Sequence, residues 1–163
     1  MGSGKTTVAR LLHIQTDVKC LDLDKLIEEE SGLPINEIFD LKGEIFFRKK
    51  EHEILKNVLS NNEQFILSLG GGTPCYYNNM EIIEKSNAVS FYLKSSADQL
   101  LQRVNNNIEN RPLLSDKSPE DLIQFIAKHI FERSFYYNRC TFTIDTDTLS
   151  ADEVAQEILN ILA

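Results

Sequence analysis

Short apolar runs alternate with longer stretches of helical periodicity along the whole chain, and this alternation limits the folds that the chain can adopt. The apolar runs are bounded by turn or polar residues, as buried strands of a parallel sheet are. They span residues 18–23, 65–69, 88–93 and 142–144. Helical periodicity occupies residues 5–15, 24–31 and 45–59, and helix-start signatures open at Ser96, Ser118 and Ser150. Strands that alternate with helices predict an α/β domain with a parallel sheet and helices on both of its faces.

The length and charge of the chain narrow the choice of partners. With 163 residues, of which 42% are hydrophobic, residues 1–163 are predicted to form a single domain. The net charge of −8 argues against a surface that recruits nucleic acid or an anionic membrane. We therefore expect a small-molecule ligand, whose negative charges are held by locally placed cations and backbone N–H groups.

The cysteines indicate a reducing compartment. Cys20, Cys75 and Cys140 are odd in number and far apart, so they predict neither a disulfide framework nor a zinc site. No apolar run is long enough to span a bilayer, and the first residues lack the features of a signal peptide. These features favour a cytoplasmic protein.

The chain opens with a partial phosphate-binding loop. In the pattern G-x-x-x-x-G-K-[ST], loop amides and a helix N-terminus hold phosphates, the Lys neutralises them and the hydroxyl reaches Mg²⁺. Gly4, Lys5 and Thr6 match the last three elements, and the first Gly of the pattern would lie one position before Met1. The alternative is an ordinary Gly/Ser loop that caps a helix.

Two further groups follow predicted strands, where ligands of α/β folds bind. Asp22 and Asp24 follow the first strand, and such a pair can hold hydrated Mg²⁺ and orient a hydroxyl. The alternative is a solvated turn in which Asp24 caps the next helix. Gly70, Gly71 and Gly72 follow the second strand. Three glycines indicate a backbone that approaches a ligand closely or adopts positive φ, although a tight turn also explains one or two of them.

Several arginines have two interpretations when they are considered alone. Arg48, Arg103 and Arg133 lie on predicted helices, where an Arg is usually solvated or ion-paired. Arg111 lies in an Asn-rich polar segment that ends before a proline, which predicts an exposed and mobile loop. A mobile loop with an Arg beside a phosphate site is a candidate lid, at about residues 105–117.

Six motifs in order resemble the shikimate kinase family, a group of P-loop small-molecule kinases related in fold to nucleoside monophosphate kinases. The motifs are GSGKTT, LDLDKLIEE, GEIFFRKKE, LSLGGG, NRPLL and ERSFYY, and they cover nearly the whole chain. The resemblance implies a three-layer P-loop kinase fold. It also implies transfer of the γ-phosphoryl group of ATP to the 3-hydroxyl of shikimate, a step of chorismate and aromatic amino-acid biosynthesis.

The resemblance also implies a role for each candidate residue. ATP would be bound by the loop residues and by two arginines, namely Gly2, Ser3, Gly4, Lys5, Thr6, Thr7, Arg103 and Arg111. Thr6 would coordinate Mg²⁺, and Asp22 would contact its hydration shell. Asp24 would bind the shikimate hydroxyls and act on the attacking one, with Lys5 and Arg111 stabilising the transferred charge. The remaining substrate contacts would come from Arg48, Arg133 and the amides of Gly70, Gly71 and Gly72.

The chain departs from the family pattern in three places. Family members begin with an apolar strand that runs into the loop, so we expect this chain to lack the central strand of a five-stranded sheet and to leave backbone groups of its neighbours unpaired. We also expect this to reflect a misassigned start or a truncated sequence. Arg103 precedes Arg111 by one residue more than in some relatives. The segment after the last strand, residues 145–148, offers no Arg toward adenine.

Two other functions stay open on sequence grounds. A related small-molecule kinase such as gluconate kinase shares the phosphate loop and the general fold, but the set of Asp24, Arg48 and Arg133 matches the shikimate pocket. A catalytically impaired nucleotide-fold protein would fit the incomplete loop. The family is often monomeric, so the resemblance implies a monomer that binds ATP, Mg²⁺ and shikimate.

Overall fold

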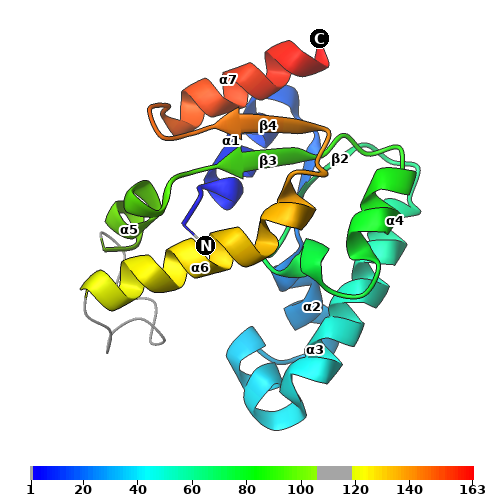
Figure 1. Ribbon diagram of the computed structural model, residues 1–163. Coiled ribbons are helices and arrows are strands. Elements are labelled where there is room, and N and C mark those ends of the chain that lie inside the picture. The colour runs from blue at the N-terminus through cyan, green and yellow to red at the C-terminus, as the bar shows by residue number, and fades with distance from the viewer. Residues whose placement is uncertain (1, 106–118) are drawn as a thin grey trace.

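The structure, a computed structural model, describes residues 2–105 and 119–163, and Figure 1 shows how their helices and strands are arranged. The elements in chain order are α1 (Lys5–Thr16), β1 (Lys19–Asp22), α2 (Leu23–Ser31), α3 (Ile35–Leu59), β2 (Phe65–Ser68), the 3₁₀ turn η1 (Thr73–Cys75), α4 (Asn79–Lys85), β3 (Phe91–Lys94), α5 (Ala97–Asn105), α6 (Pro119–Tyr137), β4 (Phe142–Asp145) and α7 (Ala151–Leu162). Strands and helices alternate, so the α/β architecture expected from the sequence is confirmed.

The four described strands form two parallel pairs. β1 pairs with β2, with Leu21 opposite Leu67, and β3 pairs with β4, with Leu93 opposite Ile144. Each strand overlaps one of the apolar runs in the sequence. Strands that run parallel place their carboxyl ends at one edge, so the residues that follow β1 and β2 lie side by side.

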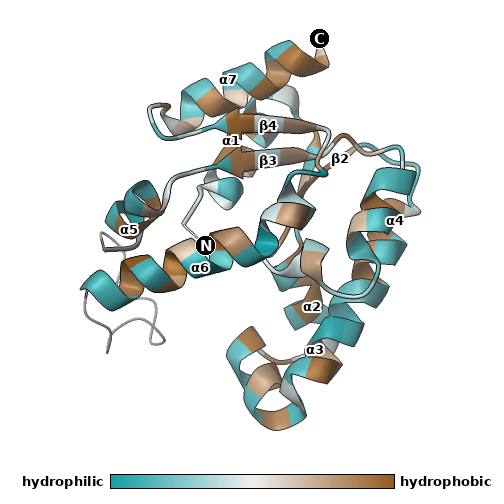
Figure 2. Ribbon diagram, viewed as in Figure 1, coloured by the Kyte–Doolittle hydropathy of each residue, from teal (hydrophilic) through white to brown (hydrophobic). Residues whose placement is uncertain are grey.

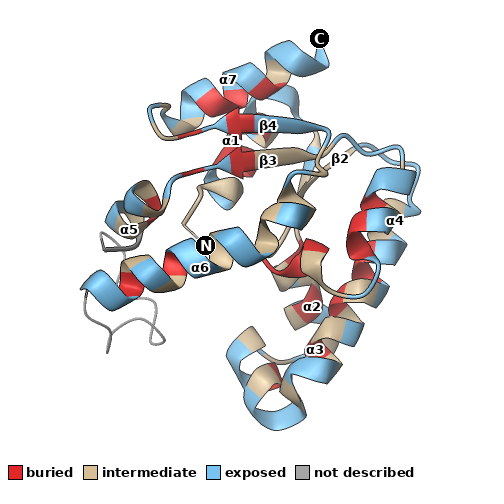
Figure 3. Ribbon diagram, in the orientation of Figure 1, coloured by how far each residue is buried: buried red, intermediate tan, exposed pale blue. Residues whose placement is uncertain are grey.

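Helices cover both faces of the strands because successive side chains along a strand point in opposite directions. In β2, Ile66 packs with α1 and α7, whereas Leu67 packs with the core formed by α2, α3 and α4. In β3, Leu93 joins the α1–α7 core, whereas the ring of Tyr92 lies 4.8 Å from that of Tyr137 on α6. Figure 3 shows the resulting buried segments where α7 lies against β4 and where α4 lies against α3.

An apolar cavity separates the two strand pairs. The cavity has a volume of about 870 Å³ and is lined by β2 and β3 and by residues of α1, α6 and α7. Within residues 2–105 and 119–163, no strand pairs with the cavity-facing edge of β2 or of β3. This agrees with the expectation of a sheet without its central strand. Unpaired strand edges leave backbone N–H and C=O groups without ladder partners.

Helix α3 begins ten residues earlier than the periodicity indicated. Gly43 interrupts it with φ 79° and ψ 169°, a left-handed φ that favours glycine, and the chain turns there between two helical segments. The hydrophobic period is broken at this point, so the sequence reveals only the second segment. Ile38 in the first segment and Phe47 in the second both reach the same core.

Two of the three predicted serine caps lie within the described residues, and both are confirmed. Ser96 Oγ accepts a hydrogen bond from Gln99 N at 3.3 Å, one residue before α5. Ser150 and Glu153 form a reciprocal capping box at α7, where hydrophobic residues lie toward β3 and β4 (Figure 2). Ser118 lies outside the described residues. Of the helices in the described parts of the chain, none is long and apolar enough to cross a membrane.

We predict that the cavity binds an apolar dye such as anilinonaphthalene sulfonate under native conditions, because its walls are largely apolar and it exceeds the size of the dye. Leu162 lines the cavity and is 53% exposed, so Leu162→Lys should weaken dye binding several-fold without unfolding the chain. Leu41 is 71% exposed and lies outside the cavity, so Leu41→Lys is the matched control. Equal dye affinity for the two variants in a fluorescence titration would contradict this placement.

Candidate active site

The loop before α1 has the backbone of an anion site. Gly2 and Gly4 adopt φ values of 74° and 83°, which favour glycine. Gly4 is the N-cap of α1, and no side chain caps the helix there. First-turn N–H groups of a helix have no partner within the helix, so they are available to a bound anion. Lys5 begins the helix, and its Nζ donates to Ser3 Oγ at 3.1 Å.

A polar pocket of about 540 Å³ lies over this loop. It brings together most of the predicted site residues from separate elements: Gly2, Ser3, Gly4, Lys5, Thr6, Thr7, Asp22, Asp24, Gly70, Gly71, Arg103 and Arg133. The larger cavity shares Lys5 and Arg133 with it, but mostly apolar walls do not suit a phosphorylated ligand. Arg111 lies outside the described residues.

Asp22 links the phosphate loop to α2. Its Oδ1 accepts from Asp24 N at 3.1 Å and from Lys25 N at 3.4 Å, so Asp22 is the N-cap of α2. The alternative in which Asp24 caps this helix is therefore wrong. Thr6 Oγ1 donates to Asp22 Oδ2 at 3.4 Å, which places a hydroxyl and a carboxylate next to each other beside the loop.

Asp24 is half-buried at the start of α2, with its carboxylate in the pocket. Burial raises the pKa of this carboxyl, and the nearby charges of Asp22, Glu51 and Glu28 raise it further, whereas Lys5 opposes the shift. A carboxylate with a raised pKa binds a proton more tightly than an exposed one, which suits a group that receives a proton from a hydroxyl.

Gly70 and Gly72 lie close to side chains, and Gly71 and Gly72 lie in a turn, as the tight-turn alternative expected for one or two of them. A Cβ on Gly70 would lie 3.3 Å from Asp24 Oδ1, and a Cβ on Gly72 would lie 3.0 Å from Arg48 Nη2. The alternative explanation, a positive φ, is wrong for all three, since the positive-φ glycines of the described chain lie elsewhere. Gly71 O accepts a hydrogen bond from Tyr137 Oη at 2.6 Å, which fixes the loop against α6.

Arg48 is ion-paired, as one of its two interpretations anticipated, and it lies beside Gly72 without lining the polar pocket itself. Its side chain is 14% exposed, and its Nη1 donates to Glu51 Oε2 at 2.8 Å. The guanidinium carbon lies 3.8 Å from the ring centroid of Tyr76. Burial alone would lower the pKa of Arg48, but the hydrogen bond and charge of Glu51 raise it, so the group stays cationic.

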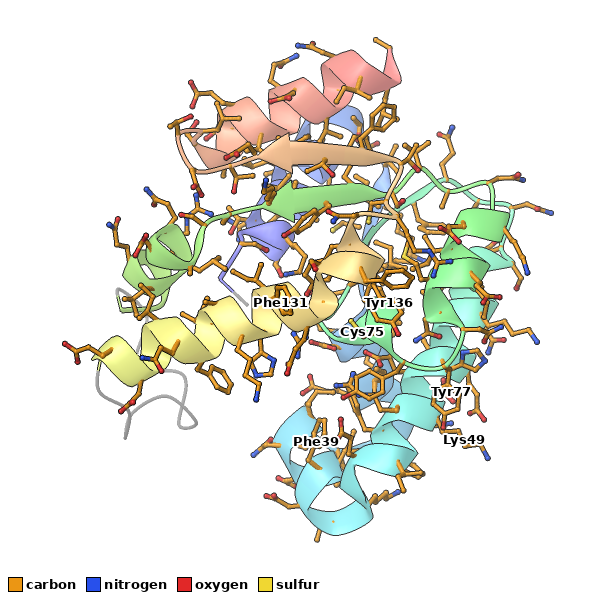
Figure 4. All side chains as sticks on the ribbon, in the orientation of Figure 1. Phe39, Lys49, Cys75, Tyr77, Phe131 and Tyr136 are labelled. Atoms are coloured by element: carbon orange, nitrogen blue, oxygen red, sulfur yellow. The ribbon has the colours of Figure 1, made fainter. Side chains whose placement is uncertain are left out.

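The charges of Arg48 and Arg133 both act on the thiol of Cys75. Cys75 lies in the space between α3 and α6, as Figure 4 shows. Burial raises the pKa of the Cys75 thiol, while the positive charges of Arg133 and Arg48 act to lower it. Both guanidinium groups thus act on the Cys75 thiol, although Arg48 and Arg133 lie 85 positions apart in the sequence (133 − 48).

Arg103 lines the pocket from α5. Its Nη2 donates to Thr146 O at 2.7 Å, and its Nη1 donates to Ser95 Oγ at 3.1 Å. The segment after the last strand carries no Arg, but its residue Thr146 binds Arg103.

Sequence reasoning missed Glu51 and Thr73. Glu51 is 1% exposed and Thr73 is fully buried, and Thr73 Oγ1 donates to Glu51 Oε1 at 2.6 Å. The available signal was the spacing of Arg48 and Glu51, which lie three residues apart on one helix and so face the same side.

Comparison with known proteins gives a consistent result. A family model described as "Shikimate kinase" matches residues 1–163. The shikimate kinase of Flavobacterium psychrophilum is 47% identical over 162 residues, which are 99% of this chain and 94% of that protein. The shikimate kinase of Flavobacterium johnsoniae is 47% identical over 163 residues, 100% of this chain and 95% of that protein.

Solved structures agree with the sequence comparison. The crystal structure of shikimate kinase from Bacteroides thetaiotaomicron superposes with a TM-score of 0.90 at 30% identity, over 99% of this chain and 93% of that one. Shikimate kinase from Acinetobacter baumannii in complex with shikimate gives a TM-score of 0.86 at 32% identity, over 99% and 88% of the two chains. The chain therefore belongs to the shikimate kinase family.

Proposed function

We propose that this member of the shikimate kinase family uses the polar pocket to transfer the γ-phosphoryl group of ATP to the 3-hydroxyl of shikimate. The observation that carries the proposal is that one pocket joins the phosphate loop to Asp24, Gly70 and Arg133. A phosphate-binding element, a carboxylate and an arginine thus reach the same space. Phosphoryl transfer needs this positioning and charge neutralisation more than covalent chemistry.

The nucleotide end of the pocket would be formed by the loop and α1. The loop amides and Lys5 would bind the phosphates, since both direct positive charge at the same place. The hydroxyl of Thr6 and the carboxylate of Asp22 would hold Mg²⁺, directly and through water respectively. These hard oxygen donors fit the ion, which takes only one or two protein ligands when phosphates supply others. Mg²⁺ would supply positive charge that neutralises the phosphates.

Asp24 would orient the attacking hydroxyl and accept its proton. The hydroxyl oxygen forms a bond to the γ-phosphorus, the bond from that phosphorus to the bridging oxygen breaks, and the proton passes to Asp24 as ADP leaves. Its raised pKa favours this acceptance. Lys5 would stabilise the charge that develops on the transferred group.

The carboxylate of shikimate would be bound at the other end of the pocket. Arg48 is already fixed by Glu51 and Tyr76, so its guanidinium is pre-organised for a planar anion. Arg133 on α6 would provide the second cation, and the amides of residues 70–72 would line the wall between them. Two guanidinium groups suit a carboxylate, which accepts paired hydrogen bonds.

The remaining assignments follow from the same function. We propose a cytoplasmic enzyme that acts as a monomer on small molecules, formed by residues 1–163 as a single domain. Its three cysteines are free thiols, which fits a reducing compartment, and its net charge of −8 disfavours nucleic acid and anionic membranes. The roles of Arg111 and of the lid at about residues 105–117 stay predictions, because Arg111 and residues 106–118 lie outside the described residues.

We expect the chain to form ADP from Mg-ATP in the presence of shikimate and not of gluconate, measured in a coupled ADP-release assay. The reason is that the proposed carboxylate site of Arg48 and Arg133 matches shikimate, which carries a carboxylate and the hydroxyl that Asp24 would orient. Turnover of gluconate alone would favour the related kinase. Turnover of neither substrate, by a chain that still binds nucleotide, would favour a catalytically impaired nucleotide-fold protein.

Arg133→Ala should raise the KM for shikimate by about ten- to a hundredfold, because it removes charge-assisted hydrogen bonds to the carboxylate. The KM for ATP should change much less. Arg139→Ala is the matched control, since Arg139 pairs with Glu84 outside the pocket. Steady-state kinetics with each substrate varied in turn distinguish the two, and equal effects on both KM values would remove the carboxylate role.

Asp24→Asn should lower kcat by about 10²- to 10⁴-fold and yet stabilise the fold at pH 7. The folded-state pKa of Asp24 lies above the ordinary value of 3.8. Its contribution to the free energy of unfolding is therefore fully present below pH 3.8 and is lost as the pH rises through the folded-state pKa. The neutral Asn avoids this loss.

Thermal melts at several pH values check this expectation. The Tm of Asp24→Asn should exceed that of the unmodified chain at pH 7, and the difference should shrink toward pH 3.8. The exposed Asp40→Asn, outside the pocket, should show neither effect. A lower Tm for Asp24→Asn at pH 7 would mean that the carboxylate stabilises the fold.

A further inference from the structure

Two buried hydroxyls lie at the carboxyl ends of β3 and β4. Ser95 directly follows β3 and Thr146 directly follows β4, and they are 5% and 2% exposed. Their oxygens lie 2.6 Å apart, so they join the ends of the two strands. The mechanism described above uses neither hydroxyl.

The hydroxyl pair forms a directed chain of hydrogen bonds that begins at Arg103. Thr146 Oγ1 donates to Lys94 O at 3.0 Å, so its proton is not available to Ser95. Ser95 therefore donates to Thr146, and Ser95 Oγ accepts from Arg103 Nη1 at 3.1 Å. Each hydroxyl donates once and accepts at least once, so the buried network is satisfied.

A second bond fixes the plane of the guanidinium. Arg103 Nη2 donates to Thr146 O at 2.7 Å, while Nη1 also lies 3.5 Å from Thr146 Oγ1. Two nitrogens bound to groups on two strand ends define the orientation of a planar group. The start of α5, the helix that carries Arg103, is held to the same region, because Ser96 N donates to Asp147 Oδ1 at 2.8 Å.

We propose that Ser95 and Thr146 are positioning residues that hold Arg103 in the orientation that binds the nucleotide. Arg103 lines the same pocket as the phosphate loop, so a fixed guanidinium presents a cation and a flat face to the bound nucleotide without further ordering. The inference rests on the proposed function for the assignment of this pocket to ATP.

The opposite ends of the same strands provide a matched control. Ser90 Oγ and Thr141 Oγ1 lie 3.2 Å apart at the amino ends of β3 and β4, and neither contacts Arg103. Thr146→Val and Thr141→Val thus remove the same chemical group from a buried pair and from an exposed pair on the same two strands. Similar unfolding transitions for the two variants establish that both are folded.

The experiment compares nucleotide binding with substrate kinetics. Thr146→Val and Ser95→Ala should each raise the Kd for Mg-ADP, measured by calorimetry, and the KM for ATP by about fivefold. The KM for shikimate should stay within about twofold, since within the described residues the hydroxyls of this pair bond to each other, to Arg103 and to Lys94, and not to Arg48 or Arg133. Thr146→Ser should restore binding, because it retains the hydroxyl and the carbonyl, and Thr141→Val should have no effect.

A double-mutant cycle with Arg103→Ala tests whether the effect passes through Arg103. Thr146→Val should change nothing further in the Arg103→Ala background. An effect that persists there, or equal losses for Thr146→Val and Thr141→Val, would overturn the proposal. The Mg-ADP measurement needs no turnover. If the proposed phosphoryl transfer is wrong, the unmodified chain will not turn over shikimate. The ratio of the Kd values for the variant and the unmodified chain still tests whether Ser95 and Thr146 position Arg103.

Discussion

The ion pair between Glu51 and Arg48 fixes the guanidinium of Arg48 beside the candidate site. A buried carboxylate costs free energy unless both oxygens have partners, and here Arg48 satisfies one oxygen and Thr73 the other. Arg48 lies on α3 and Thr73 opens the turn after β2, so the carboxylate joins two elements that are distant in sequence. Gly72 can then approach Arg48 closely, and Gly70 can approach Asp24.

Positive side chains gather at the polar pocket although the chain is acidic overall. Lys5 lies at the phosphate loop, Arg103 at the ends of β3 and β4, and Arg133 on α6, so three cations reach one pocket from three directions. Asp24 lies among them, where burial disfavours its charge. An anionic ligand is thus attracted locally, although the net charge of −8 repels anions at long range.

The sequence predicted the strands and most of the helices, missed α4, and predicted the detailed contacts poorly, for physical reasons. Apolar runs marked every described strand because buried strands must be apolar, and the glycine run marked a close approach. The cap of α2 was ambiguous because Asp22 and Asp24 both suit an N-cap, and only the backbone direction decides. Glu51 was missed because its second partner, Thr73, is reached only through a tertiary contact, and Gly43 hid the first part of α3 by shifting the helical period.

The cavity between β2 and β3 separates two halves of the molecule, each of which contains one pair of strands. One half carries β1 and β2 with Asp24 and Arg48, and the other carries β3 and β4 with the anchor of Arg103. No backbone ladder joins the halves within the described residues, so side-chain packing of α1, α6 and α7 transmits force between them. Packing of apolar side chains is non-directional and resists sliding less than a hydrogen-bond ladder does. Within the described residues, the walls of the polar pocket that come from the two halves are therefore joined by side-chain packing and not by a backbone ladder.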